Sequence, residues 1–440
     1  MRTMKHKMLA RYPIGNPRRA WRQDNFLLSI ANPGPIGLEY KDEWTAKKTR
    51  RAVKTCLDLG FNLLDTCWAS PEMGMEIVRT AEALGGKIIY QNLKRFGGMG
   101  EANVFCKTND LIGAIRDTAQ WNCIAGYYMW DEPTTDEQLA ETGRMITACE
   151  KERPGLLPFT VALPSYHRLT RWEDGAYAPY IERFADTVDP AQLSFDYYPI
   201  GLRGYTEAAQ LDDCLMWCDL EVVRRAAQKR SIPFWFCYQG QKFHFYKYAE
   251  RFTYPMVRML ANAGILHGAV QLTCYTEFEG MVDPETGGEG IYFAEHQRFL
   301  REIRELGNTL MALSCRRVIH DDSLLPDCAY MQGLRATMED SELLTGKLPL
   351  RISVSEHTDA YGNRYLMVLN RDYDRDAHFS LTLKERSHVY RVDAADGEQR
   401  LSFMDTAVLT GHLEAGALSL YRVQSATEEP FTVEYYLSKD

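Results

Sequence analysis

The stretch that decides the fold is "CIAGYYMWDEPTTDEQ", residues 123–138. A nearly continuous apolar run passes into two adjacent carboxylates, Asp131 and Glu132, and then into a proline and a polar segment. Thr134 or Thr135 can cap a following helix that carries two acids in its first turn. A buried strand that leads directly into a capped helix is the repeating unit of an α/β fold.

Seven similar apolar runs lie on either side of this one. The eight runs cover residues 25–32, 61–67, 87–92, 124–132, 157–164, 192–199, 232–239 and 268–276. They are apolar almost throughout, as strands covered on both faces are, and amphipathic segments such as 41–59 separate most of them. Eight strand–helix units predict an α/β fold of the (β/α)8 TIM-barrel type. A doubly wound open sheet is the rival, and it is disfavoured because "SIANPGPIG" after the first run lacks a glycine-rich phosphate turn.

The pattern changes after about residue 325. Short alternating segments separated by turns follow, namely "LRISVSEHTD", "RYLMVLNRD", "AHFSLTLK", "HVYRVDA" and "GALSLYRV". The intervening "HTDAYGNR" is typical of a hairpin connection. We therefore expect two domains, a barrel over residues 1–324 and a C-terminal antiparallel β-sandwich over residues 325–440.

The composition narrows the classes of partner. The chain has 440 residues and a formal net charge of −9, which argues against nucleic acid or an anionic membrane as the partner. No apolar run approaches the ~20 residues of a membrane span. The cysteines are scattered, and the one close pair, Cys214 and Cys218, has no second pair at ligand spacing. We expect reduced thiols in a cytoplasm, no metal and no cofactor; a secreted protein whose leader was removed is the alternative, and homo-oligomerisation stays open.

Polar residues gather where the predicted strands end. In a barrel these ends form one mouth, where the chemistry of such folds lies. The polar residues are Asn32, Asp65, Gln91, Asn92, Asp131, Glu132, Asp196, Tyr197, Tyr198, Gln239, Tyr275 and Glu277, with Trp68, Trp130, Trp235, Tyr128 and Tyr238 beside them. Any single one of these residues can cap a helix or pair with loop backbone. That explanation is weak for the whole ring, because each buried polar group left without a partner costs about 1–3 kcal/mol of stability. Carboxylates and amides bind vicinal hydroxyls and aromatic faces cover sugar rings, so the ring predicts a carbohydrate ligand.

The motif "WDEP" resembles one found in the clan of (β/α)8 glycoside hydrolases that includes the family 42 β-galactosidases. In that clan the fourth strand ends in Asn-Glu-Pro, so the resemblance implies that Glu132 is the general acid/base and that Asp131 replaces the usual Asn. The segment "LEAGALSLYRV" also looks like the C-terminal module of such enzymes. The clan places its nucleophilic Glu at the end of the seventh strand, where this chain has Gln239, and an amide cannot perform that role.

Three explanations of this difference remain open. The second carboxylate can come from Asp196 on the sixth strand or from Glu277 after the eighth. The chain can instead resemble hexosaminidases that use substrate-assisted catalysis, in which Glu132 is the acid and Asp131 orients the acetamido group of the substrate. The third explanation is a carbohydrate-binding barrel without catalysis.

The adjacent acids themselves favour catalysis. Two carboxylates at close range cannot both ionise freely, and apolar cover from Trp130 also raises the pKa of a carboxyl group, which supplies a proton donor near neutral pH. The plainer interpretation is that Asp131 begins a turn and Glu132 pairs with a basic residue. The acidic, glycine-rich segment 276–290 is interpreted as a lid over the mouth.

We therefore predict a glycoside hydrolase with Glu132 as the acid, Asp131 as its partner, and Asp196 or Glu277 as the second carboxylate. The predicted substrate-binding residues are Asn32, Asp65, Trp68, Gln91, Asn92, Tyr128, Trp130, Tyr197, Tyr198, Gln239 and Tyr275. The predicted partner is a carbohydrate substrate, with no nucleic acid and no membrane.

Overall fold

The computed structural model describes residues 4–6, 14–33, 45–67, 69–91, 107–167, 169–172, 174–200, 214–240, 252–275, 280–322, 333–395 and 398–428. Statements about the structure refer to these residues.

All eight predicted barrel strands are present, and they are parallel. They are β2 (Leu27–Ala31), β3 (Leu63–Asp65), β4 (Ile88–Tyr90), β5 (Ile124–Asp131), β6 (Leu157–Val161), β7 (Leu193–Tyr197), β8 (Phe234–Gln239) and β9 (Gln271–Tyr275). Their order in the sheet is β6-β5-β4-β3-β2-β9-β8-β7. A parallel bridge between Ala162 and Phe195 joins β6 to β7, with Ala162 N–H donating to the Ser194 carbonyl at 2.9 Å. The sheet is therefore closed, and the predicted (β/α)8 barrel is confirmed.

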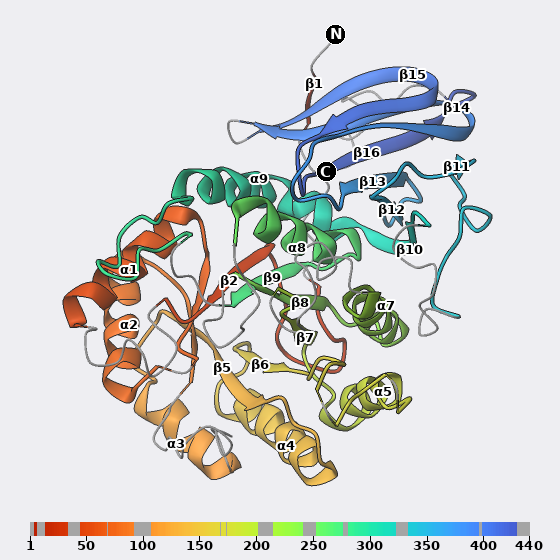
Figure 1. Cartoon of the computed structure of the whole chain (residues 1–440). Helices are drawn as coiled ribbons and strands as arrows, with labels where there is room; N and C mark the ends of the chain where they lie inside the picture. Colours follow the sequence, from red (N-terminus) through yellow and green to blue (C-terminus); the bar gives the residue numbers. More distant parts are fainter. Residues whose placement is uncertain are drawn as a thin grey trace.

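Helices alternate with these strands and surround the barrel (Figure 1). They are α1 (Ala46–Leu59), α2 (Pro71–Leu84), α3 (Thr108–Asp117), α4 (Asp136–Glu152), α5 (Tyr177–Val188), α7 (Cys214–Lys229), α8 (Tyr254–Leu266) and α9 (Phe293–Ala312). Thr135 caps α4, as predicted, and forms a capping box with Gln138. No helix in this part of the chain is long and apolar enough to cross a membrane.

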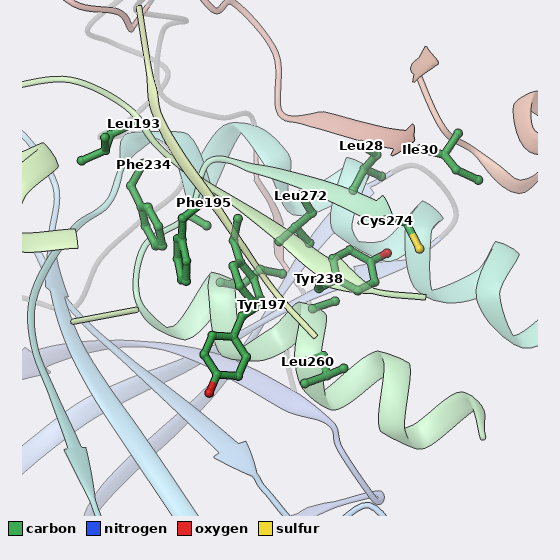
Figure 2. Packing of buried hydrophobic residues seen from close by; sticks show 14 of the residues in the cluster. Leu28, Ile30, Leu193, Phe195, Tyr197, Phe234, Tyr238, Leu260, Leu272 and Cys274 are labelled. Carbon is green, nitrogen blue, oxygen red and sulfur yellow. The ribbon is translucent and has the colours of Figure 1, made fainter. Parts of the chain in front are cut away.

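Each barrel strand presents alternate residues to two different environments. On β7, Leu193, Phe195 and Tyr197 belong to the main apolar core, which also contains residues of the surrounding helices. Figure 2 shows part of this outer layer, in which Tyr197 and Tyr238 lie among apolar side chains. The residues between them, such as Ser194 and Asp196, face the barrel interior, so polar chemistry is confined to one face of each strand.

The amino-terminal end of the barrel is closed by the segment that precedes β2. The rings of Trp21 and Trp235 meet edge to face with centroids 5.7 Å apart. The Gln23 side chain accepts a hydrogen bond from the Trp235 indole at 3.0 Å and donates to the Val270 carbonyl at 2.6 Å. Because this end is filled, a ligand reaches the interior from the carboxyl ends of the strands.

The C-terminal antiparallel β-domain is also confirmed. Its strands are β10 (Ser314–His320), β11 (Leu344–Thr345), β12 (Ile352–Thr358), β13 (Arg364–Asn370), β14 (Ala377–Ala395), β15 (Glu398–Leu413) and β16 (Leu418–Ser425), and β1 (Met4–His6) joins them. They pair in the order β1-β15-β14-β16-β13-β12-β10, with β11 on β14. The sheet curls around a second apolar core. The predicted hairpin is present between β12 and β13, where Gly362 N–H donates to the Asp359 carbonyl at 3.1 Å.

The β-domain contacts the barrel through α8 and α9 (Figure 1). Arg258 of α8 forms an ion pair with Glu414 at 2.8 Å, and Asn262 donates to the Gly416 carbonyl at 2.9 Å. Strand β10 follows α9 directly and pairs with β12. The predicted boundary between residues 324 and 325 lies outside the described residues.

Candidate active site

An irregularity in β5 brings two residues of the opening motif into the barrel. Tyr128 pairs with Phe159 and Asp131 pairs with Val161. Between these two pairs β5 advances by three residues while β6 advances by two, so β5 contains one extra residue. This bulge allows Tyr128 and Asp131 to face the same way although they are three residues apart. The Tyr128 hydroxyl donates to Asp131 Oδ1 at 2.7 Å. The bulge thus places the Asp131 carboxylate in the barrel, where the Tyr128 hydroxyl orients it.

The same bulge determines the face of β5 on which Trp130 lies. Regular alternation from Tyr128 turns the Trp130 side chain inward, but with the extra residue Trp130 packs in the outer apolar core instead. Its predicted contact with substrate stays a prediction.

Glu132 follows with a backbone conformation that is unusual for its residue type. Its φ angle is 51°, in the left-handed region that favours glycine, and its N–H donates to the Val161 carbonyl at 3.2 Å. For a residue with a Cβ this conformation costs roughly 1–2 kcal/mol. Strain of this kind persists where the surrounding structure imposes it and is typical of functional sites. Here it turns the Glu132 carboxyl group into the barrel mouth beside Asp131.

The strain predicts a difference between two substitutions that both remove the carboxyl group. We expect Glu132→Gly to have a free energy of unfolding about 1 kcal/mol higher than Glu132→Ala, because glycine adopts positive φ without a steric penalty. Urea denaturation of the two variants measures the difference. Equal stabilities, or a more stable alanine variant, would show that the backbone at this position is not strained.

A cavity of about 130 Å³ lies at the carboxyl ends of the strands. Its lining residues in the described part of the chain are Ala31, Asp65, Cys67, Tyr128, Asp131, Glu132, Phe159, Val161, Asp196, Tyr198, Cys237, Thr273 and Tyr275. Four of these side chains are carboxyl groups, and none is a lysine, arginine or histidine. The site therefore combines several acids with aromatic rings and has no basic counterpart among these lining residues.

Glu132 and Asp196 form the closest pair of acids. Burial, followed by the charges of Asp196 and Asp131, raises the pKa of Glu132 well above its usual value. Burial and the charge of Asp131 raise the pKa of Asp196 to about 7, although hydrogen bonds from Tyr198 and Glu132 oppose the shift. The raised pKa of Glu132 favours its protonated form, and its carboxyl group donates a hydrogen bond to the Asp196 carboxylate. The other oxygen of Asp196, Oδ1, is buried without a hydrogen-bond partner in the described structure.

Asp131 and Asp65 complete the set of carboxyl groups. Burial raises the pKa of Asp131 to about 6, and the hydrogen bond from Tyr128 limits the rise. Burial raises the pKa of Asp65 well above its usual value, the backbone N–H of Cys67 opposes this, and the charge of Asp131 adds to it. That N–H donates to Asp65 Oδ1 at 2.8 Å. Asp131 therefore interacts with acids on both sides, Asp65 on one and the Glu132–Asp196 pair on the other.

Aromatic rings form one wall of the cavity. Tyr198 and Tyr275 are stacked, with ring centroids 4.7 Å apart and an angle of 25° between their planes. Tyr128 meets Phe159 edge to face at 4.8 Å. Flat apolar faces beside carboxylates suit a ring that carries C–H groups on one side and polar groups at its rim.

The structure brings together seven of the predicted site residues: Asp65, Tyr128, Asp131, Glu132, Asp196, Tyr198 and Tyr275. Trp68, Asn92 and Glu277 lie outside the described residues. Asn32 and Gln91 are buried beside strand ends without lining the cavity. Tyr197 lies on the opposite face of β7 from Tyr198, and its ring packs edge to face on Tyr166 at 5.0 Å, so its predicted contact with substrate stays a prediction.

Sequence reasoning missed several lining residues. Cys67, Phe159 and Cys237 face the cavity, together with Ala31, Val161 and Thr273. The available signal was the period of two along each strand, since Cys67 lies two residues after Asp65 and Thr273 lies two before Tyr275. The two thiols give no signal of their own, because their sequence neighbours are apolar and a thiol in such a run is typical of a core residue.

Gln239 has a structural role that requires an amide. Its side chain donates to the Ile200 carbonyl at 3.0 Å and accepts from the Ile200 N–H at 2.8 Å. It thereby fastens the chain after β7 to the end of β8, and it does not line the cavity. The predicted contact of Gln239 with substrate stays a prediction.

This pairing predicts a pH-dependent cost for Gln239→Glu. An ionised carboxylate repels the Ile200 carbonyl, so we expect the free energy of unfolding at pH 8 to fall by about 1–3 kcal/mol or more. At pH 4 a protonated Glu can donate as Gln does, and the loss should shrink. Denaturation at the two pH values measures it; a loss that is equal at both would contradict the two-way hydrogen bond as the reason for the amide.

No family model and no curated protein matches the sequence. Solved structures do match in fold. A β-L-arabinopyranosidase of glycoside hydrolase family 27 from Geobacillus stearothermophilus has a TM-score of 0.50 and 10% sequence identity, covering 92% of this chain and 98% of its own. Two Bacteroides fragilis structures, named as an α-galactosidase/melibiase and an α-galactosidase, have TM-scores of 0.50 at 11% and 12% identity, each covering 91% of this chain and 79% of their own. At this identity the likeness establishes the shared fold alone.

Proposed function

We propose that this chain is a glycoside hydrolase in which Glu132 is the general acid and Asp196 is the second carboxylate. The observation that carries the proposal is the hydrogen-bonded contact of these two groups at the barrel mouth. The pKa of Glu132 is raised well above its usual value and the pKa of Asp196 is raised to about 7. The (β/α)8 fold shared with the named glycosidases supports the hydrolase class, and the resemblance of "WDEP" to the family 42 clan supports Glu132 as the acid; the assignment of Asp196 rests on its contact with Glu132.

The pair has the two protonation states that glycoside hydrolysis needs. A protonated Glu132 can transfer its proton to the oxygen that leaves, and an ionised Asp196 can act at the anomeric carbon or on a water beside it. In the structure the two groups are hydrogen-bonded to each other, so a sugar must enter between them. Oδ1 of Asp196, which has no partner in the described structure, is free to face that sugar.

The separation of the pair favours retention of configuration. Retaining enzymes place their carboxyl groups ~5–5.5 Å apart, and inverting enzymes place them ~6.5–9.5 Å apart. Two hydrogen-bonded carboxyl groups must separate only slightly to reach the shorter spacing. We therefore assign Asp196 as the nucleophile, and NMR of the first-formed product, with retained anomeric configuration expected, tests this assignment.

A second candidate is substrate-assisted cleavage of an N-acetylated sugar. It is favoured by one observation, namely that Asp131 and Glu132 both line the cavity. In this mechanism Asp131 orients the acetamido group, and strong inhibition by a thiazoline analogue is expected. A non-catalytic carbohydrate-binding barrel is the other alternative, and absence of turnover on every glycoside would favour it.

The test of the proposal is a panel of aryl glycosides assayed across a range of pH. Hydrolysis requires an ionised Asp196, whose pKa is raised to about 7. We therefore expect kcat/KM to fall about tenfold per pH unit below pH 7 and to be highest above it, until Glu132 loses its proton. Absence of turnover on every glycoside would overturn the proposal. An optimum near pH 4–5 would overturn the assignment of Asp196 as the ionised partner.

A further inference from the structure

The cavity holds more acids than the proposed reaction uses. Glu132 and Asp196 suffice for the chemistry, yet Asp131 and Asp65 also line the same 130 Å³ space. Asp65 is 1% exposed, and its pKa is raised first by burial and further by the charge of Asp131. These two acids form a second pair beside the catalytic pair.

The cavity also contains a buried acceptor that has no partner. Asp196 is 6% exposed, and its Oδ1 atom lacks a hydrogen bond in the described structure. Leaving a buried acceptor unpaired costs about 1–3 kcal/mol, and more for a charged group. This cost, independently of the number of acids, indicates that a ligand presents an electropositive group, such as an anomeric carbon, to Oδ1 inside the cavity.

The described lining offers these acids no positive charge. Its residues include no lysine, arginine or histidine, so the acids lower their repulsion by binding protons. A ligand with a hydroxyl group leaves that arrangement unchanged. A ligand with an ammonium group can replace one of the protons and provide up to three donors to the carboxylates.

The geometry of the site favours an organic cation over a metal ion. In the described part of the chain, no group of three or more His, Cys, Asp or Glu side chains is placed to hold a metal. The stacked rings of Tyr198 and Tyr275 lie at the same cavity, and aromatic faces attract ammonium groups as well as sugar C–H groups. The volume is close to the ~150 Å³ that accommodates a benzene-sized ring, which corresponds to one sugar ring.

We propose that the substrate is a glycoside whose terminal sugar carries a free, protonated amino group, with Asp65 and Asp131 binding the ammonium and Glu132 and Asp196 flanking the anomeric carbon. This assignment rests on the proposed hydrolase function and narrows its substrate class. It excludes N-acetylated sugars as preferred substrates, because acetylation removes the charge that the acids compensate.

The test is calorimetric binding of matched sugars to the full chain at pH 7. The probes are glucose and galactose, their 2-amino and 6-amino derivatives, and the N-acetylated forms of the 2-amino sugars. We expect at least one amino sugar to bind tenfold or more tightly than its neutral parent and its N-acetylated form. Binding should release protons. Repeating the titration in buffers of different ionisation enthalpy detects this release.

Asp65→Asn provides the matched variant. Asparagine keeps an oxygen to accept from the Cys67 N–H and removes only the charge. We expect the ratio of the dissociation constants of the neutral parent and the amino sugar to fall close to one in this variant. Asp24→Asn, at an exposed position on the other end of the barrel, should leave the preference unchanged.

The outcomes separate this inference from the proposed function. Hydrolysis of neutral glycosides without any preference for amines overturns the substrate class and leaves the hydrolase proposal standing. Preferential binding of an amino sugar without turnover of its aryl glycosides overturns the hydrolase proposal and supports the cation site. Equal or tighter binding of the N-acetylated forms, or no binding of any probe, overturns the inference. If Asp65→Asn does not fold, the comparison of the sugars on the unmodified chain tests the substrate class by itself.

Discussion

Glu132→Gln should lower kcat/KM by ~10³-fold or more for aryl glycosides with poor leaving groups, such as phenyl glycosides. Glutamine has nearly the same shape as glutamate but carries no proton that it can transfer to the leaving oxygen. A dinitrophenyl leaving group departs without protonation, so we expect its glycosides to lose less than about tenfold. The measurement is the slope of log(kcat/KM) against leaving-group pKa in the two proteins, which should be much steeper in the variant.

Glu137→Gln is the control for this experiment. Glu137 lies five residues further along the chain, in the first turn of α4, and is exposed. The same chemical change there should leave kcat/KM within about twofold. An equal loss for all leaving groups in Glu132→Gln would contradict a role as general acid and would indicate a role in binding alone.

Asp196→Asn should abolish hydrolysis and at the same time stabilise the protein at neutral and alkaline pH. The pKa of Asp196 is raised in the folded chain from 3.8 to about 7, mainly by burial. The folded state therefore retains a proton that the unfolded state releases between about pH 4 and pH 7. Stability from this group is fully present below about pH 4 and is lost as pH rises to about 7. Asparagine does not ionise, so the variant avoids this loss.

The expected gain is on the order of 2–4 kcal/mol at pH 8 and close to zero at pH 3.5, since each pKa unit corresponds to about 1.4 kcal/mol. Urea denaturation at the two pH values measures it, with Glu137→Gln again as the control. A gain that is independent of pH, or a loss of stability at pH 8, would contradict the view that a strained, partly protonated acid is held in the cavity. Stability gained at the expense of activity is the usual result when an active-site group is removed.

The fold was predictable because its main signal is local. Each barrel strand is an apolar run covered on both faces, and segments with helical periodicity separate most of the runs, so all eight strands could be placed. The C-terminal domain was predicted less completely. The segments "AHFSLTLK" and "HVYRVDA" form the single strand β14, interrupted by a register shift between Thr382 and Ser387, and β10, β11 and β15 were not predicted. Such pairings depend on contacts between distant segments, which local pattern does not encode.

The site was predictable to the extent that strand ends meet at one mouth. Asp65, Glu132 and Asp196 lie together as expected, although 67 and 64 residues separate consecutive members of the set. The face on which Trp130 lies could not be predicted, because a one-residue bulge reverses the face of every later side chain in β5. The hydrogen bonds of the Gln239 amide could not be predicted, because their partner is the backbone of Ile200, which no sequence pattern indicates.

The most direct test of the central claim is a crystal structure of Glu132→Gln soaked with an intact aryl glycoside that the unmodified enzyme hydrolyses. We expect one sugar ring against Tyr198 and Tyr275, with the glycosidic oxygen within hydrogen-bond distance of the substituted side chain at position 132. The anomeric carbon should face Oδ1 of Asp196, which has no hydrogen-bond partner in the described structure. A sugar bound away from this pair, or one whose anomeric carbon faces neither carboxyl group, would contradict it.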